Sequence, residues 1–234
     1  CYPRDLCKVC IPTLTDPRGA DFNAYERINQ NFSFVELERR AVRAFRSLGV
    51  MMTDTCINYQ TVMPPVLGEH LAMGDTGVVI YSNSVQGART NYEGGPSALA
   101  SALTGRTARY GFHLDEKRRG TALFHLEVTP RNWTEWGVLG GIVGNAMGSY
   151  FQVPVIDGIT GPAPTSDDLK HFGAALASYG STAMFHIVGV TPEAPNVRAV
   201  FDSTPPKSTR ISLADIEAFM VGYGEGDDSL DVVR

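Results

Sequence analysis

The chain has 234 residues, of which 43% are hydrophobic and 19% charged, a balance typical of a folded globular protein rather than a disordered one. The formal net charge of -5 and the isoelectric point near 5.5 argue against a nucleic-acid partner, because a nucleic-acid-binding face is basic. No apolar run approaches the roughly 20 residues of a membrane span, and four cysteines are too few for a disulfide framework. The composition therefore predicts a cytoplasmic protein that binds neither nucleic acid nor a membrane.

The first predicted elements are a strand, a helix and a loop. The apolar run at 7–12 favours a short buried strand. Residues 33–49 form a predicted amphipathic helix, with a capping box between Ser33 and Glu36 and a glycine stop at its last position. Residues 53–70 contain two prolines and no periodicity, which indicates a loop. The predicted apolar face of the helix comprises Phe34, Leu37, Ala41, Ala44, Phe45 and Leu48.

The middle of the chain alternates predicted strands with small-residue helices. "GVVIYSNS" (77–84) favours a buried strand, and "GGPSALASALTG" (94–105) favours a short helix with a proline near its start. A strand at 120–130 precedes a glycine-rich helix at 132–148, and another strand follows at 150–159. Each glycine disfavours a helix by about 1 kcal/mol, so the glycines of this helix indicate close packing against a neighbour.

The last third opens with a Pro/Gly-rich stretch that resembles a linker. Ser166 is the predicted cap of a helix that ends at Gly180. A strand at 183–190 and a helix at 212–224, which opens on a Ser-x-x-Asp box, follow. The chain ends on "SLDVVR", which reads like the beginning of another strand.

Alternating strands and helices of this kind predict a layered α/β fold. The change in composition divides the chain into an α/β region at 1–160, which carries the candidate site loops, and a second α/β domain that begins at 161–234. The chain opens on Cys1 instead of methionine and ends within a strand-like run. We therefore expect a segment of a longer polypeptide with an incomplete second domain.

Two cysteine patterns are candidates for metal or redox chemistry. Cys7 and Cys10 have the C-x-x-C spacing, but they lie in the run predicted as a strand, where a structural role is the favoured alternative. Cys56 lies in a polar loop, "TDTCINYQ", whereas a structural cysteine is usually surrounded by aliphatic residues. Its thiolate could ligate iron or zinc, and a structural role is the equal alternative.

"LGEH" places Glu69 and His70 side by side in a loop. They are a candidate ligand or acid-base pair that needs partners from elsewhere in the chain, and a solvated acidic turn is the alternative. His113 and His171 are interpreted as structural, and the "EKRR" run as a solvated face.

The stretch "SNSVQGARTN" (82–91) makes the strongest local case for a binding site. It follows a predicted strand, and ligands in α/β folds bind beyond the carboxyl ends of strands. Arg89 carries a permanently charged fork that suits a carboxylate or a phosphate. An ordinary polar turn is the alternative, and the phosphate-binding GxxxxGK[ST] pattern is absent. Further hydrogen-bonding groups come from Ser82, Asn83, Ser84, Thr90 and Asn91.

These segments together resemble one protein family. The order "TDTCINYQ", "LGEH", "YSNSVQGARTNYEGGPSALASALTGR" and "YGFHLDE" resembles the aconitase X family, especially its bacterial branch, which contains cis-3-hydroxy-L-proline dehydratases. The resemblance runs from about Asp16 to Ala194. Met73 stands where many relatives carry tryptophan, and Tyr92 where many carry arginine. Both differences bear on the substrate more than on the family.

The resemblance implies an aconitase-like fold, in which α/β domains surround an iron or iron-sulfur site and a separate swivelling domain is present. Cysteines hold the cluster in this family, and Cys56 matches the one in its "TxTC" motif. Relatives carry further ligands beyond the point where this chain stops, and "DSLDVVR" resembles the strand before one of them. The catalytic base is then expected on the swivelling domain, fused or in a separate subunit. Cys7 and Cys10 match positions that are often valine in relatives.

The resemblance also implies roles for the candidate residues. Arg89 is expected to hold the substrate carboxylate, and Glu69 and His70 to lie near the iron and the leaving hydroxyl group. Ser84, grouped with these catalytic residues, is expected to orient the substrate together with the binding residues Asn83, Thr90 and Asn91.

The predicted function is dehydration of a hydroxy acid by a hydro-lyase. The favoured substrate is cis-3-hydroxy-L-proline, which would give Δ1-pyrroline-2-carboxylate by loss of water and enamine-imine tautomerisation. The nearest competing function is the family's dehydration of mevalonate 5-phosphate. It requires more basic residues around the pocket than Arg89, the one arginine of residues 82–91, which we call the signature stretch. An enzyme for an unrecognised hydroxy acid is a third candidate. A candidate from a different class is a non-catalytic anion-binding module in which Cys56 is structural.

Overall fold

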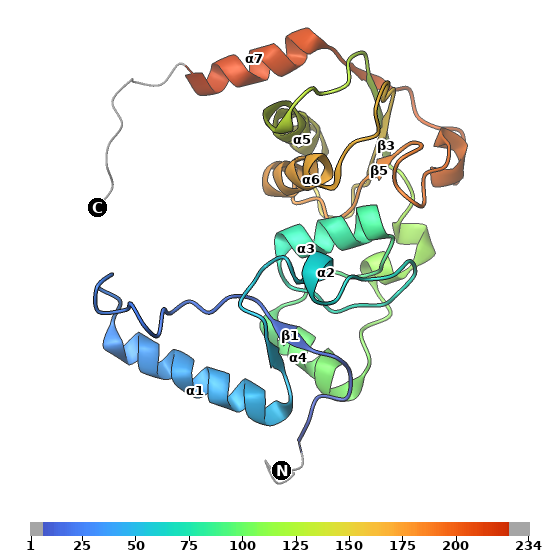
Figure 1. Cartoon of the computed structure of the whole chain (residues 1–234). Helices are drawn as coiled ribbons and strands as arrows, with labels where there is room; N and C mark the ends of the chain where they lie inside the picture. Colours follow the sequence, from blue (N-terminus) through green and yellow to red (C-terminus); the bar gives the residue numbers. More distant parts are fainter. Residues whose placement is uncertain (1–6, 225–234) are drawn as a thin grey trace.

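The computed structural model describes residues 7–224, so Cys1 and the strand predicted from "DSLDVVR" lie outside the described residues. The architecture is mixed α/β, as predicted, with two parallel sheets of different size. In Figure 1 the N-terminal elements occupy one end of the molecule, and the larger sheet with its helices occupies the other.

The smaller sheet consists of two short strands that a long helix connects. β1 (Leu14–Thr15) pairs in parallel with β2 (Met51–Met52), and α1 (Phe32–Leu48) connects them. The helix ends at Gly49, whose φ of 89° is left-handed, which confirms the predicted glycine stop.

The strand predicted at 7–12 does not form. The backbone N–H of Val9 donates to the carbonyl of Leu48 at 2.9 Å, and that of Cys10 donates to the carbonyl of Ala102 at 2.8 Å. These bonds attach the segment to the ends of two helices and do not make a ladder. Both Cys7 and Cys10 are exposed.

The cap and the buried face of α1 also differ from the prediction. Asn31 caps the helix, because its side chain accepts a hydrogen bond from the backbone N–H of Ser33 at 2.8 Å. Val35 and Val42, seven residues apart, are the buried positions, whereas Phe34 and Leu37 are exposed. Periodicity identifies an apolar stripe, but the neighbouring elements decide which side of the helix is covered.

The larger sheet has four parallel strands, and each of the three that were predicted is shorter than its predicted range. Three correspond to the strands predicted in the middle and last third of the chain, and the fourth was not predicted. Three hydrogen-bonded residues at an edge carry too little alternation to be recognised in a sequence. The order across the sheet is β5 (His186–Ile187), β4 (Pro154–Asp157), β3 (Ala122–Leu126) and β6 (Thr209–Ile211).

Two helices pack closely beside this sheet. Figure 1 shows α5 (Trp133–Met147) and α6 (Ser166–Gly180) side by side. A Cβ atom on Gly140 would lie 2.4 Å from the carbonyl oxygen of Phe172. The glycine-rich helix is therefore confirmed, with glycines where two backbones approach each other.

The run "GVVIY" is helical, and the predicted strand is wrong. α3 (Thr76–Tyr81) begins at Asp75, whose carboxylate accepts from the backbone N–H groups of Gly77 and Val78. A π-helical turn (Ser82–Gln86) continues it without a break. The apolar residues of α3 are buried on all sides, and a short run of that kind looks the same whether it forms a strand or a helix.

The cap of α6 is Thr165, not Ser166, because Thr165 makes reciprocal bonds with Asp168. The helix predicted near the C-terminal end is confirmed as α7 (Leu213–Gly224). The domain boundary predicted near residue 160 falls between β4 and α6, and stays a prediction. The remaining helices are α2 (Asn58–Thr61), which interrupts the predicted loop, α4 (Gly95–Thr104), which was predicted, and 3-10 turns at Gly111–His113, Asp115–Lys117 and Val197–Val200.

Candidate active site

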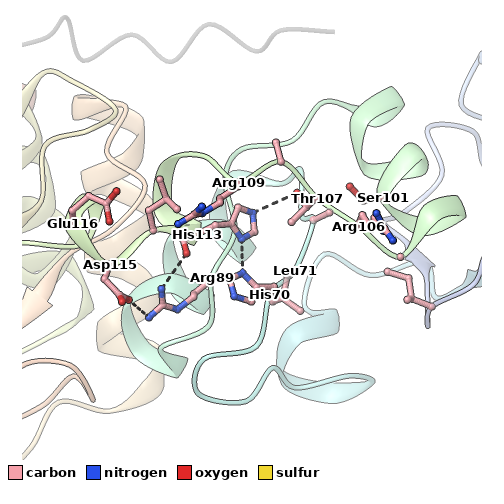
Figure 2. Close-up of a pocket in the computed structure, with 15 residues that line it drawn as sticks. His70, Leu71, Arg89, Ser101, Arg106, Thr107, Arg109, His113, Asp115 and Glu116 are labelled. Atoms are coloured by element: carbon pink, nitrogen blue, oxygen red, sulfur yellow. Dashed lines mark hydrogen bonds and ion pairs between the residues drawn. The ribbon is translucent and has the colours of Figure 1, made fainter.

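A cleft of about 630 Å³ gathers titratable side chains from separate segments. Figure 2 shows histidine and arginine side chains around it. These groups come from the "LGEH" segment, from the signature stretch and from the connection that follows α4. Its charged and histidine lining residues are His70, Arg89, Arg106, Arg109, His113, Asp115 and Glu116.

Backbone pairing brings His70 and Arg89 together. The N–H of Arg89 donates to the carbonyl of Glu69, and the N–H of Leu71 donates to the carbonyl of Arg89, both at 2.8 Å, which makes a parallel bridge. Gly87 allows this approach, because its φ of 68° is left-handed and a Cβ atom there would lie 2.4 Å from the side chain of Leu67. The two segments singled out in the sequence therefore meet at the cleft.

The guanidinium of Arg89 is held in place by two acceptors. Its Nη1 donates to the carbonyl of His113 at 3.1 Å, and its Nη2 donates to Oδ1 of Asp115 at 2.5 Å. Hydrogen bonding to Arg89 and its charge lower the pKa of Asp115. Because 75% of the Asp115 side chain is exposed, this ion pair at the cleft is open to competition from another carboxylate.

His70 contacts His113, which the sequence interpretation had treated as structural. Their Nδ1 atoms lie 2.8 Å apart, and the rings are stacked with an interplanar angle of 21°. His113 is buried and His70 exposed. Burial is the main cause of the lowered pKa of His113, and His70 adds to it. A neutral histidine therefore lies behind His70 on the protein side of the cleft.

Arg106 and Arg109 line the same cleft from the segment after α4. Both are exposed, and neither makes an ion pair with another residue in the described part of the chain. Sequence reasoning missed them, because they lie outside the signature stretch. The "TGRTARYG" segment in which they occur gave a signal only through its two closely spaced arginines.

Asn83 and Ser84 lie in the π-helical turn and are buried. Asn83 donates from Nδ2 to the carbonyls of Thr90 and Ala183, and its Oδ1 accepts from the N–H of Thr90 at 3.0 Å. Ser84 Oγ accepts from the N–H of Phe185 at 2.9 Å. These bonds fix the turn to the segment before β5.

Thr90 and Asn91 are buried as well. Thr90 Oγ1 accepts from the N–H of Met73 at 3.0 Å and donates to the carbonyl of Asn91 at 2.9 Å. Asn91 Oδ1 accepts from the N–H of Phe112 at 3.0 Å. Their observed partners are protein groups, so these residues hold the segment that carries Arg89.

Cys56 is exposed in the loop before α2 and lies near Asp16 and Asp75. Burial, followed by the charges of these two carboxylates, raises the pKa of its thiol. Negative charge near Cys56 disfavours a free thiolate, but the same charge favours a cation bound to that thiolate. Asp16 also lines a second, more apolar cavity of about 410 Å³, to which Glu69 and His70 contribute. His70 therefore belongs to both cavities.

A complete metal site is not found in the described part of the chain. No group of three or more His, Cys, Asp or Glu residues is arranged there to hold a metal ion. Cys56, with its acidic neighbours, has the chemistry of a single ligand to a cation. Neither Cys7 nor Cys10 lines either of the two cavities.

Two family models cover most of the sequence. The model described as aconitase X first domain matches residues 4–116, and the model described as aconitase X second domain matches residues 120–220. No helix in the described part of the chain is both long enough and apolar enough to cross a membrane.

Curated relatives carry two different names. The phosphomevalonate dehydratase large subunit of Methanosarcina mazei is 39% identical over 188 residues, covering 80% of this chain and 46% of the relative. The cis-3-hydroxy-L-proline dehydratase of Hypocrea jecorina is 34% identical over 229 residues, covering 96% of this chain and 38% of the relative. The chain thus spans less than half the length of these relatives.

A solved structure resembles the fold described above. The holo form of Thermococcus kodakaraensis aconitase X matches with a TM-score of 0.78 and 32% sequence identity, covering 95% of this chain and 53% of that one. The structural match therefore includes both the small sheet with the cleft and the larger sheet.

Proposed function

The chain belongs to the aconitase X family, and on that premise we propose that it forms part of a hydro-lyase that removes water from a small hydroxy acid. The observation that carries this proposal is the cleft in which Arg89, His70 and His113 meet. Such an elimination needs a group that holds a carboxylate while charge builds on it, and a donor to the departing hydroxyl oxygen. A guanidinium and an imidazole in one cleft match these two needs.

Arg89 is the proposed carboxylate clamp. Its guanidinium is fixed before any ligand arrives, and the exposed carboxylate of Asp115 already accepts a hydrogen bond from it at the cleft. A substrate carboxylate can take the same donor by displacing Asp115. Asn83, Ser84, Thr90 and Asn91, which the sequence predicted to orient the substrate, would contribute by holding the segment that carries Arg89.

Cys56 is the proposed ligand for iron or an iron-sulfur cluster. When bound, such a centre supplies a Lewis acid for the leaving hydroxyl group. Asp16 links the surroundings of Cys56 to the second cavity, where Glu69 and His70 lie. This shared cavity supports a role for Glu69 and His70 on the hydroxyl side of the substrate, and the remaining ligands and the base are proposed to come from other parts of the enzyme, including a swivelling domain.

The substrate proposed from the sequence is cis-3-hydroxy-L-proline. Arg106 and Arg109 support a second candidate, mevalonate 5-phosphate, because two exposed guanidinium groups at the rim are suited to a phosphate. The sequence interpretation had disfavoured this substrate for lack of basic residues beyond Arg89. The cleft supplies two more.

The deciding experiment assays the complete, iron-reconstituted enzyme with both compounds, alongside the double variant Arg106→Ala, Arg109→Ala. If mevalonate 5-phosphate is the substrate, the double variant loses about 10²-fold or more in kcat/KM, since charge-assisted hydrogen bonds contribute about 1.5–3 kcal/mol each. If cis-3-hydroxy-L-proline is the substrate, the wild type dehydrates it and the double variant changes its rate little. Turnover of neither compound, together with ligand binding that survives Cys56→Ser, would instead favour a non-catalytic anion-binding module.

A further inference from the structure

His113 contributes a hydrogen bond to the cleft that the proposed function does not yet use. It is 6% exposed, and its ring lies behind that of His70. Figure 2 shows Thr107 on one side of His113 and His70 on the other. Thr107 Oγ1 lies 3.5 Å from His113 Nε2, and His113 Nδ1 lies 2.8 Å from His70 Nδ1. The three side chains therefore form a row that ends at the cleft.

We propose that His113 is a positioning residue for His70, which it holds in the tautomer that carries its proton on Nε2. In this arrangement the Thr107 hydroxyl donates to His113 Nε2, and His113 Nδ1–H donates to His70 Nδ1. His70 Nε2–H is then left to donate into the cleft. In the described part of the chain no protein group accepts from that nitrogen. The inference rests on the proposed role of His70 beside the leaving hydroxyl group.

The contact between two Nδ1 atoms has room for a single proton. If both nitrogens carried one, two N–H groups would face each other at hydrogen-bond distance. A free imidazole exchanges its proton between both nitrogens, whereas a hydrogen bond at one nitrogen selects the tautomer of the other. A fixed Nε2–H group is useful here because it can donate a hydrogen bond to an oxygen that gains negative charge as its bond to carbon weakens.

The surroundings favour a neutral His113. Burial is the largest cause of its lowered pKa, the neighbouring His70 acts in the same direction, and Arg89 and Arg118 add smaller effects. Glu93 acts in the opposite direction. The other charged residues that line the cleft are Arg106, Arg109, Asp115 and Glu116. The neutral form can donate through Nδ1 and accept through Nε2, as the proposed row requires.

The tautomers are tested by ¹⁵N NMR of the complete enzyme with labelled histidines, because imidazole nitrogen shifts distinguish protonated from unprotonated nitrogens without turnover. We expect His70 as the Nε2–H tautomer and His113 as the Nδ1–H tautomer. The opposite assignment would overturn the proposal. If the expected tautomers are found but neither candidate substrate is dehydrated, the proposed function fails while the pairing stands.

Two variants separate positioning from packing. His113→Phe keeps the stacked ring and removes the hydrogen bond, whereas His113→Asn keeps a small polar group near the Nδ1 position. We expect His113→Phe to make His70 a mixture of tautomers and to lower kcat by about tenfold or more, with KM within about twofold, since general acid-base groups contribute about 10²–10⁴-fold. His113→Asn is expected to recover part of the loss.

The matched control is His171→Phe, which replaces an exposed histidine stacked on Trp133 outside the cleft. It should leave both the tautomer of His70 and kcat unchanged. An unchanged His70 tautomer in folded His113→Phe would show that His113 only fills space, and so would an equal loss in His113→Phe and His113→Asn with unchanged nitrogen shifts. If the Phe variant does not fold, the Asn variant decides by the same spectrum.

Discussion

Asp115 and a substrate carboxylate compete for the same guanidinium in the proposed site. Arg89 donates to Asp115 and to the carbonyl of His113, so its side chain both lines the cleft and ties two segments together. An exposed ion pair is worth little, about 0–1 kcal/mol. A substrate carboxylate can therefore displace Asp115 easily, whereas the bond to the carbonyl of His113 keeps the Arg89 guanidinium in position.

This competition predicts opposite effects for two neighbouring substitutions. Asp115→Asn should lower KM by a few-fold, because it frees donors of Arg89, and Arg89→Lys should lower kcat/KM by about 10²–10³-fold, because an ammonium group cannot replace the two-pronged contact. Steady-state kinetics of the complete iron-loaded enzyme measure both. Arg119→Lys is the control, since Arg119 pairs with Asp202 and does not line the cleft. Equal losses in both arginine variants would contradict the proposed role.

Cys56 is the cysteine whose substitution should reduce the amount of bound iron. Cys56→Ser in the complete enzyme is expected to remove most of the bound iron, because a serine hydroxyl is a far weaker ligand than a thiolate. Iron content and the visible absorption spectrum after anaerobic purification measure this. Cys10→Ser, another exposed cysteine, should retain the iron. Iron retained in Cys56→Ser, or lost equally in both variants, would rule out Cys56 as the ligand.

His186 predicts a loss of stability on mild acidification. It is 1% exposed and its Nε2 donates to the carbonyl of Arg118 at 2.7 Å. Burial lowers its pKa. In the unfolded chain a histidine titrates near 6.5, so the unfolded state binds more protons once the pH falls below about that value. The contribution of the neutral His186 to stability is then fully present at neutral pH and declines as the pH falls toward the pKa of the folded state. The loss is about 1.4 kcal/mol for each unit by which the folded and unfolded pKa values differ.

The measurement for His186 compares denaturant unfolding at pH 7.5 and pH 5.5. The wild type should lose more stability between the two than His186→Gln, because the glutamine amide can keep the bond to the carbonyl and does not titrate in this range. Since His113 also has a lowered pKa, the variant should retain part of the pH dependence. Identical pH dependence in the two proteins would contradict the assignment.

The contact between α5 and α6 depends on glycines at particular positions. A Cβ atom on Gly140 would lie 2.4 Å from a carbonyl oxygen of α6, and one on Gly144 would lie 2.9 Å from another. Gly137 belongs to the same helix, but apart from its chain neighbours and the nearby backbone of α5 itself, no heavy atom lies within 4 Å of its Cβ position. Only some glycines of α5 therefore serve the packing that the sequence predicted.

Two alanine substitutions in α5 should change stability in opposite directions. Gly140→Ala should destabilise the fold by about 1–3 kcal/mol, because the added methyl group forces the helix backbones apart. Gly137→Ala should stabilise it by about 0.5–1 kcal/mol, because alanine is the better helix former. Chemical denaturation of both variants measures the difference. A destabilising effect of the same size at Gly137 would show that helix propensity and close approach are not the cause.

Arg118 joins the two regions matched by the family models, which end at residue 116 and begin at residue 120. It is 2% exposed. Its guanidinium donates to the carbonyls of Asn83 and Phe112 on one side, and to the carboxylate of Glu193 on the other. A buried charge with this many partners fixes how the cleft region sits on the larger sheet.

Loss of this junction should be more costly than loss of a surface ion pair. Arg118→Ala should destabilise the protein by about 3–5 kcal/mol, because it leaves two buried carbonyls and the Glu193 carboxylate without their donor. The control is Arg210→Ala, which removes an exposed pair with Glu127 and should change stability by less than about 1 kcal/mol. Thermal unfolding measures both. A small change in Arg118→Ala would show that the regions are joined by apolar contacts instead.

Most regular elements could be predicted where a local signal was complete. Gly49 and Gly105 stop their helices as glycines usually do, and β3 and β4 lie within their predicted ranges. α3 could not be distinguished from a strand, because the residues that bury it come from distant parts of the chain. The caps of α1 and α6 were misplaced by two residues and one residue, since several neighbouring polar residues are able to cap a helix, whereas the predicted box between Ser212 and Asp215 is present at the start of α7.

The sequence by itself determined the family and the α/β class, because both depend on motifs and apolar periodicity. These are formed by residues close together in the chain and can be recognised without the structure. It also identified Arg89 and His70 as candidates. Only the tertiary structure decided their surroundings: His113 meets His70 from 43 residues away, and Arg106 and Arg109 reach the same cleft from outside the signature stretch. A contact between distant residues leaves no periodic trace in the sequence, because it is made by the packing of whole elements and not by local backbone preference.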